Sequence, residues 1–275
     1  MTSYDALKNI VTNENWLNKP NVSINENVNK VEIGLAGQPE RWTVCCREKV
    51  EVDFNTLYAI IVNKEYGVLP NQPEISGSIL DIGGYVGGFA RYAVESKLEN
   101  RSVIVIEPVS ANVGMIQRNM ENHKEGNFLF KAAVGNSGIG KILCRSAMEH
   151  TDRYPIDPSY YVGNVIDYAH YIPIKYDHYE DVPIWSLEEL LNVVEICTGT
   201  RNVFYMKIDC EDGEYPLFMN ASPQDLRQIK YVVGEFHREK EVLDNIFLPL
   251  NFKPMALTDS QILDTHMFGY ERIDG

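Results

Sequence analysis

The pattern of hydrophobic and polar positions changes near residue 78. After it, short and nearly continuous apolar runs predict strands that are buried on both faces of a sheet. These runs cover residues 78–82, 103–107, 128–134, 203–209 and 231–237. Amphipathic segments at 86–97 and 111–122 separate the first three runs and predict helices. The alternation is typical of a doubly wound, mainly parallel α/β sheet of the Rossmann-like type.

The two ends of the chain extend this picture. Segments 252–257 and 265–273 predict a terminal antiparallel pair of strands. Residues 1–77 are interpreted as a mixed N-terminal extension, and residues 78–275 as the α/β domain. Within the extension we expect a helix at 5–17, a strand at 42–46 and a further helix capped by Asp53. The apolar face of that further helix comprises Leu57, Ile60, Ile61 and Tyr66.

A segment between the third and fourth strands, at about 145–183, departs from the alternation. Its part from 154 to 179 is rich in tyrosine and also carries His170 and His178. Long irregular connections in compact domains are usually lids or binding loops, and tyrosine density argues against disorder. We interpret the segment as a substrate lid, with a packing insertion or an oligomer interface as the alternatives.

Composition narrows the choice of partner and compartment. The 275 residues include 25 Lys plus Arg and 39 Asp plus Glu, which gives a net charge of −14. This balance argues against nucleic-acid binding and against docking on an anionic membrane, and it favours a small-molecule partner. The five cysteines contain no CxxC pair, and the sequence shows no apolar membrane span or signal peptide. We therefore expect a cytoplasmic protein with reduced thiols and leave a homo-oligomer open.

A glycine-rich turn joins the first predicted strand of the domain to its helix. The dinucleotide fingerprint GxGxxG fails there, because Tyr85 stands where its middle glycine should be and would obstruct a pyrophosphate. The spacing DxGxxxG is instead satisfied by Asp81, Gly83 and Gly87. This pattern suits a cofactor without phosphates, with Asp81 acting through its neighbours or a water on the ligand's ammonium group.

A second acid indicates that the ligand carries a ribose. Glu107 ends the second strand, twenty positions after Gly87, and an acid there can accept hydrogen bonds from both ribose hydroxyls. Together with the failed fingerprint, this position favours S-adenosylmethionine over NAD.

Several segments in order resemble the FkbM-type S-adenosylmethionine-dependent methyltransferases. The matching residues are 80–87 (LDIGGYVG), 106–108 (IEP), Asn112, Asn119, 133–135 (AVG), 186–191 (SLEELL), 207–211 (KIDCE), Glu214 and 235–237 (EFH). The resemblance implies the class I methyltransferase fold and O-methylation of a sugar or natural-product hydroxyl. The chain departs from the family at Gly84-Tyr85, where Ala-Asn is usual, and at Asp212, where Gly is usual.

The cofactor site is expected to comprise residues of the turn and of the neighbouring strand ends. These are Asp81, Gly83, Gly84, Tyr85, Gly87, Glu107, Pro108, Ala132 and Asp209. Since ligands of open α/β sheets bind beyond the carboxyl ends of the strands, Asp209, Glu235 and His237 are the catalytic candidates. His237 is the preferred base because an ordinary imidazole titrates near working pH.

Other assignments, in the predicted lid and at the same strand ends, stay open. His170 and His178 are alternative bases. We expect Lys207 to form an ion pair with Asp209 and Glu211, which share its side of the strand. No metal-ligand set is assigned, because the spacing of the acids is not diagnostic. Magnesium held by Asp209, Glu211 and Glu235 is kept as an alternative.

These observations predict an S-adenosylmethionine-dependent methyltransferase that acts on a hydroxyl of a small molecule. N-methylation is the nearest alternative. A catalytically silent relative that binds the cofactor, or only a partner protein, is the alternative from another class of function. An NAD-dependent enzyme comes third.

Overall fold

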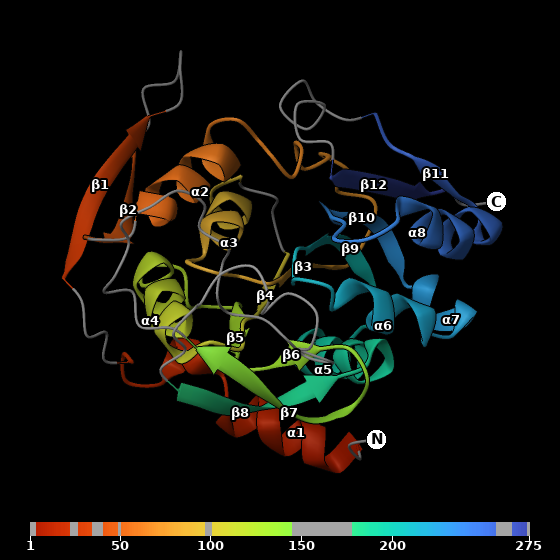
Figure 1. The fold of residues 1–275 in the computed structure, drawn as a ribbon, viewed down its shortest axis with the longest axis horizontal. Helices are drawn as coiled ribbons and strands as arrows, with labels where there is room; N and C mark the ends of the chain where they lie inside the picture. Colours follow the sequence, from red (N-terminus) through yellow and green to blue (C-terminus); the bar gives the residue numbers. More distant parts are fainter. Residues whose placement is uncertain are drawn as a thin grey trace, which may run out of the picture.

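The structure is a computed structural model that describes residues 4–22, 27–34, 41–48, 51–96, 101–144, 178–256 and 266–273. Its centre is a seven-stranded sheet in the order β11-β12-β10-β9-β3-β4-β5 (Figure 1). The strands are β3 (Ser78–Ile82), β4 (Val103–Ile106), β5 (Phe128–Phe130), β9 (Val203–Ile208), β10 (Ile229–Glu235), β11 (Phe252–Pro254) and β12 (Met267–Arg272). The five strands from β10 to β5 in this order pair with one another in parallel. In contrast, β12 runs antiparallel to both of its neighbours, β10 and β11. The predicted mainly parallel α/β sheet with a terminal antiparallel pair is confirmed.

The order of the strands reverses at β3. The chain runs outward through β4 to β5 and later returns to the other side of β3 with β9 and then β10. The carboxyl ends of β3 and β9 therefore lie next to each other at a topological switch point. In open α/β sheets this is the place where ligands bind.

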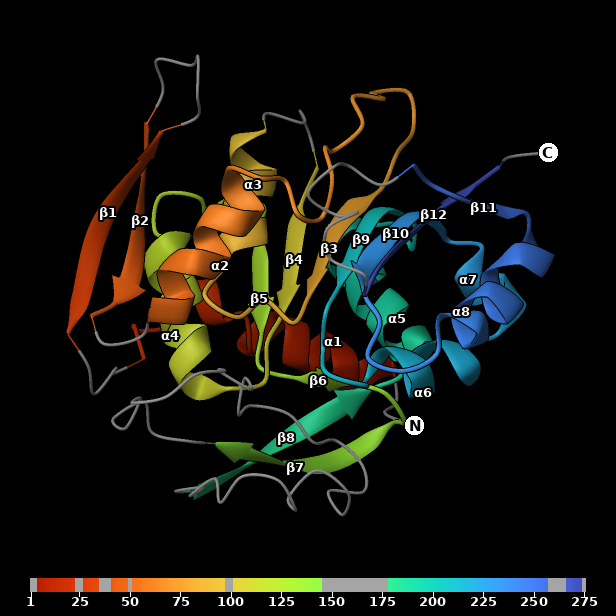
Figure 2. The ribbon, with the colours of Figure 1, turned by 45° about the horizontal axis from the view of Figure 1, so that its top comes forward.

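Helices cover both faces of the sheet (Figures 1 and 2). One face carries α2 (Glu51–Ile61), α3 (Gly88–Glu95) and α4 (Ser110–Asn119). The other carries α1 (Tyr4–Asn13), α5 (Leu187–Thr198), α6 (Glu214–Met219), α7 (Pro223–Leu226), α8 (Lys240–Phe247) and the short 3₁₀ turn η2 (Leu248–Leu250). Successive strand residues point to opposite faces, so Leu80 and Ile82 enter one core and Ile79 the other.

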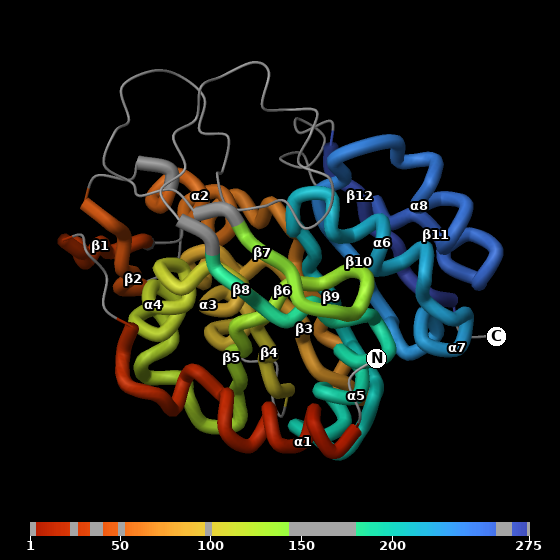
Figure 3. The backbone as a smooth tube through the Cα atoms, turned by 60° about the horizontal axis from the view of Figure 1, so that its bottom comes forward, coloured from red at the N-terminus to blue at the C-terminus, as the bar shows by residue number. Residues whose placement is uncertain are grey.

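Residues before 78 complete both cores. Leu7 and Val11 of α1 pack with α5, beside which α1 lies in Figure 3, and Leu57 and Ile60 of α2 pack against α3. The predicted helix at 5–17 ends at Asn13 and is followed by the 3₁₀ turn η1 (Trp16–Asn18). The strand predicted at 42–46 is β2 (Arg41–Arg47), and it pairs with β1 (Val28–Gly34) in a hairpin that the sequence analysis missed.

Asp53 is not the N-cap that we expected. It is the third residue of α2, and its carboxylate is fully buried. Both of its oxygens accept hydrogen bonds from the Arg47 side chain, at 2.7 and 2.9 Å. The residue therefore fastens α2 to β2 instead of starting the helix.

The third predicted strand, 128–134, is two strands in different sheets. β5 ends at Phe130, and β6 (Ala133–Val134) joins a three-stranded sheet with β8 (His178–Trp185) and β7 (Gly138–Cys144) (Figure 2). The chain leaves the central sheet because β6 pairs with β8. Residues 145–177 of the lid predicted at about 145–183 lie outside the described residues. The rest of that segment, from His178, belongs to β8.

The helices in the described ranges include none with the length and apolar character needed to cross a lipid bilayer.

Candidate functional site

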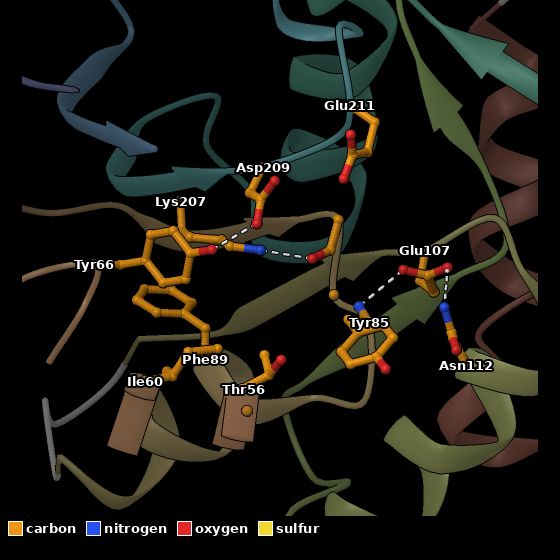
Figure 4. Close-up of a pocket in the computed structure, with 13 residues that line it drawn as sticks. Thr56, Ile60, Tyr66, Tyr85, Phe89, Glu107, Asn112, Lys207, Asp209 and Glu211 are labelled. Atoms are coloured by element: carbon orange, nitrogen blue, oxygen red, sulfur yellow. Dashed lines mark hydrogen bonds between the residues drawn. The ribbon is translucent and has the colours of Figure 1, made fainter. Parts of the chain in front are cut away.

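A cavity of about 100 Å³ opens at the switch point between β3 and β9 (Figure 4). Its walls come from the glycine-rich turn after β3, the end of β4, the end of β9 and one face of α2. It is smaller than the roughly 300–1,000 Å³ of pockets that enclose a drug-sized ligand. Polar groups on its walls include Glu107, Lys207, Asp209 and Glu211.

Gly83 allows the ends of the two central strands to meet. Its φ is +75°, and a Cβ at this position would lie 1.7 Å from the backbone oxygen of Asp209. The glycine is therefore required by the close approach of the residue that follows β9. Gly83 and Gly84 line the cavity, but Gly87 precedes α3 and does not.

Tyr85 adopts a backbone conformation that is uncommon for a bulky residue, with φ of +47°. Its backbone N–H donates to Oε2 of Glu107 at 2.8 Å, and its hydroxyl donates to Oδ1 of Asp53 at 2.7 Å. In Figure 4 the ring lies on the α2 side of the cavity, toward Thr56. Because Asp53 is paired with Arg47, the N-terminal extension holds this ring in place.

Glu107 is a buried carboxylate on the cavity wall, at the end of β4. Its Oε1 accepts hydrogen bonds from the backbone N–H of Val109 at 3.0 Å and from Asn112 at 3.2 Å. These donors and the Tyr85 N–H orient the carboxylate at the position expected for a ribose contact. Two other expected cofactor residues, Pro108 and Ala132, do not line the cavity, and Ala132 is buried in the core.

Lys207 and Asp81 form a buried ion pair behind the turn. The Lys207 Nζ lies 3.3 Å from Oδ1 of Asp81 and donates to the Gly83 oxygen at 2.6 Å. Burial opposes a charge on Lys207, yet the carboxylates of Asp81 and Asp209 hold its pKa above the ordinary value. The ion pair that we predicted with Asp209 and Glu211 is wrong in its partner, because the parallel register places Asp81 opposite Lys207.

Asp81 is therefore not in contact with the cavity. Its carboxylate is fully buried, accepts a hydrogen bond from the Ala90 N–H at 3.1 Å and lies behind Lys207. Its effect on a ligand would pass through Lys207, which does line the cavity.

Asp209 follows β9 and faces the cavity. Its Oδ2 accepts a hydrogen bond from the Tyr66 hydroxyl at 2.6 Å (Figure 4). Burial and the charge of Asp209 raise the pKa of Tyr66 well above its ordinary value, so the hydroxyl keeps its proton and remains a donor. Tyr66 lies beyond the end of α2 at Ile61, so the expectation that it belongs to the apolar face of that helix is wrong. Its contact with Asp209 depends on tertiary structure and has no local signal in the sequence.

His237 is surrounded by three carboxylates. Its Nδ1 lies 2.9 Å from Oε1 of Glu214, a fully buried residue that begins α6. Its Nε2 lies 3.5 Å from Oε2 of Glu211 and 3.8 Å from Oδ1 of Asp209. Glu214 entered the sequence analysis only through the family resemblance, since its contact with His237 depends on tertiary structure.

The environment of His237 changes the role that we expected for it. Burial disfavours the charged ring, but the hydrogen bond to Glu214 and the charges of Glu214, Glu211 and Asp209 outweigh burial and raise the pKa to about 10. The ring is therefore protonated at neutral pH in the protein alone. The expectation of a base with an ordinary pKa is wrong for this state.

In the turn between Asp209 and Glu214, two residues other than glycine have a left-handed backbone conformation. The φ angles are +52° at Glu211 and +75° at Asp212, whereas Gly213 has a negative φ. Asp tolerates this region better than most residues, which makes Asp212 suitable at this position. Glu235, the remaining catalytic candidate, is half-buried at the end of β10 and does not line the cavity.

Comparison with known proteins identifies neither a family nor a function for the chain. No family model matches the chain, and no curated protein matches it.

Proposed function

We propose that this protein is an S-adenosylmethionine-dependent methyltransferase of the FkbM type that methylates a hydroxyl of a small molecule. The observation that carries the proposal is the position of Glu107. This buried carboxylate lines a cavity at the switch point of the sheet, beside the glycine-rich turn. An acid so placed is suited to accept hydrogen bonds from the hydroxyls of a ribose.

The turn supports a nucleoside without a diphosphate. In dinucleotide-binding folds the middle glycine lets the backbone approach the pyrophosphate. Tyr85 stands at that position, and its ring is fixed by Asp53 on the wall of the cavity. Glu107, Gly83 and Gly84 would hold the nucleoside part of the cofactor, and Lys207 lies at the same wall for its carboxylate end.

The residues after β9 are suited to the acceptor. When bound, S-adenosylmethionine supplies an electrophilic methyl group. Asp209 faces the cavity with one oxygen held by Tyr66, so its other oxygen is oriented to receive a hydrogen bond from an acceptor hydroxyl and to take up its proton. In the protein without a metal ion, His237 is protonated beside Asp209 and Glu211 and keeps these two carboxylates close together. It thereby acts as a positioning residue.

The charge around the cavity narrows the class of acceptor. Asp209 and Glu211 line it, and the whole chain carries a net charge of −14. A phosphorylated acceptor would be repelled, so a neutral saccharide or a natural-product alcohol fits better. An amine would also be attracted, which retains N-methylation as the nearest alternative.

A catalytically silent relative is the second candidate function, and the size of the cavity favours it. The volume of about 100 Å³ and the two hydrogen bonds that hold Tyr85 leave less room than an enclosed nucleoside needs. In this alternative the fold is used to bind a partner protein, and Tyr85 blocks the cofactor.

Calorimetric titration of the protein, with a metal chelator present, with S-adenosylhomocysteine and, separately, with NAD⁺ tests the proposal. We expect saturable binding of S-adenosylhomocysteine and none of NAD⁺. Binding of NAD⁺ alone would overturn the assignment, and binding of neither would favour the silent relative. Transfer of labelled methyl groups to a panel of saccharides, alcohols and amines then separates O- from N-methylation.

A further inference from the structure

We propose that Asp209, Glu211 and His237 bind a divalent transition-metal cation, such as Mn²⁺, at the mouth of the cavity. One ligand atom from each side chain lies within 4.8 Å of the other two. The three residues come from the turn after β9 and the end of β10, which the switch point brings together. Among the described residues, no other group of three or more His, Cys, Asp and Glu side chains has its ligand atoms this close together.

The distances around Nε2 suit coordination. Ligand atoms bound to one cation through bonds of about 2.1 Å lie roughly 3–4 Å from one another. The Nε2 atom of His237 is 3.5 Å from Glu211 Oε2 and 3.8 Å from Asp209 Oδ1. A cation can therefore contact all three groups after small movements of the carboxylates, of which Glu211 is the most exposed, at 39 %.

The buried Glu214 distinguishes this group from an ordinary cluster of surface acids. It contacts Nδ1 of His237 at 2.9 Å and accepts a hydrogen bond from the His237 backbone N–H at 3.2 Å. Metal-binding histidines usually donate their second ring N–H to such a carboxylate, which fixes the ring orientation and makes the other nitrogen a better ligand. Glu214 directs Nε2 toward Asp209 and Glu211 in this way. A cation bound at Nε2 takes the place of the proton that the ring carries in the protein alone, and that proton passes to solvent.

The donor set indicates the class of cation. One imidazole nitrogen and two carboxylate oxygens suit Mn²⁺ or a related first-row ion, whereas Mg²⁺ prefers oxygen donors throughout. The magnesium set kept open from the sequence included Glu235, which is not part of this group. Three protein ligands leave coordination positions for water or a substrate oxygen, and Asp209 and Glu211 line the cavity from which a substrate would enter.

Such a cation would assist the proposed reaction. A metal-bound hydroxyl loses its proton more readily than a free one, because the cation stabilises the negative oxygen. The role of the ion as an activator of the acceptor rests on the proposed function. Its binding to the three side chains does not.

Manganese binding is tested on the full chain, after removal of metals with a chelator and without any nucleoside, by titration with Mn²⁺ followed by electron paramagnetic resonance. We expect one saturable site in the unaltered protein. Asp209→Asn and Glu211→Gln should each weaken binding at least tenfold. Asp212→Asn is the matched control, because Asp212 lies in the same turn but pairs with Arg238 at 2.8 Å. Binding to this control should stay within about twofold of the unaltered protein.

Equal weakening by Asp212→Asn would show general attraction to negative charge and overturn the site, as would the absence of saturable binding. If the Asp209 or Glu211 variants do not fold, the unaltered protein still decides the matter. Its bound Mn²⁺ should show a nitrogen coupling from imidazole, and a bound ion with oxygen ligands only contradicts the proposal. Because S-adenosylhomocysteine binding is measured separately with chelator present, failure here leaves the proposed function standing.

Discussion

Tyr85 has a strained backbone conformation, and its side chain also lines the candidate site. A left-handed conformation costs an L residue about 1–2 kcal/mol. At Tyr85, with φ of +47°, hydrogen bonds to Glu107 and Asp53 offset that cost. The same contacts keep the ring on the wall of a small cavity. Binding of the proposed cofactor therefore requires the ring to shift or the cavity to widen.

Replacing Tyr85 with Asn should tighten binding of S-adenosylhomocysteine. Asn adopts the left-handed region more readily than Tyr and has no ring to narrow the cavity. We expect about a tenfold gain, equivalent to about 1.4 kcal/mol, in calorimetric titration. Tyr85→Phe keeps the ring and serves as the control, with no such gain. Weaker binding by Tyr85→Asn would mean that the ring contributes to the nucleoside site.

Substitution of Asp81 should lower the free energy of unfolding, because Asp81 lies behind Lys207 and does not line the cavity. Its substitution by Asn leaves Lys207 buried without its ion-pair partner, and breaking a buried pair typically costs about 3–5 kcal/mol. Chemical denaturation of Asp81→Asn should show a loss of this size in the free energy of unfolding. Adding Lys207→Met removes the uncompensated charge and should restore part of it. A loss below about 1 kcal/mol in Asp81→Asn would contradict the ion pair.

At the scale of elements, the contact between β3 and β9 depends on Gly83. Gly83→Ala should cost more than about 3 kcal/mol of unfolding free energy or prevent folding, because the new Cβ would collide with the Asp209 backbone oxygen. Gly126→Ala is the matched control. Its φ is +70°, but no atom lies within 4 Å of the added Cβ, so only the conformational cost of about 1–2 kcal/mol applies. Denaturation curves compare the two, and equal losses would show that strand approach is not the cause.

The central sheet could be predicted from the sequence, while the smaller sheets could not. Apolar runs such as 203–209 predict strands that are buried on both faces, and their alternation with helices predicts that the strands are parallel. β6, with two residues, is too short for a pattern, and β1 was missed because its alternation is weak. Asp53 looked like a helix cap because its partner, Arg47, lies on another element.

The same division applies to the candidate site, which is assembled by the whole molecule. Glu107, Asp209 and His237 could be selected because strand ends meet at one edge of the sheet. The partners that define their chemistry could not, since Tyr66 and Glu214 reach them only through tertiary packing. The raised pKa of His237 follows from these neighbours, and no local sequence pattern indicates it.

Burial should protect the thiols of Cys46 and Cys197 in the folded protein. It raises the pKa of Cys197 to about 12, and burial with the charge of Asp53 raises that of Cys46 to about 11. The thiolate is the reactive form, so at pH 8 the folded protein should be alkylated at Cys197 roughly a thousandfold more slowly than an ordinary cysteine. Reactivity should rise with pH toward 12. Mass spectrometry of iodoacetamide-treated protein checks this, with urea-unfolded protein as the control, and equal native and unfolded rates would contradict it.

In the proposed function, the whole fold places Glu107 at the switch point to hold a nucleoside. Calorimetric titration of Glu107→Gln with S-adenosylhomocysteine tests this role, with Glu125→Gln as a control at an exposed position. Hydrogen bonds to a charged group contribute about 1.5–3 kcal/mol, so Glu107→Gln should bind at least tenfold more weakly while the control binds like the unaltered protein. Circular dichroism of both variants confirms that they are folded. Undiminished binding by a folded Glu107→Gln would contradict a nucleoside contact at Glu107.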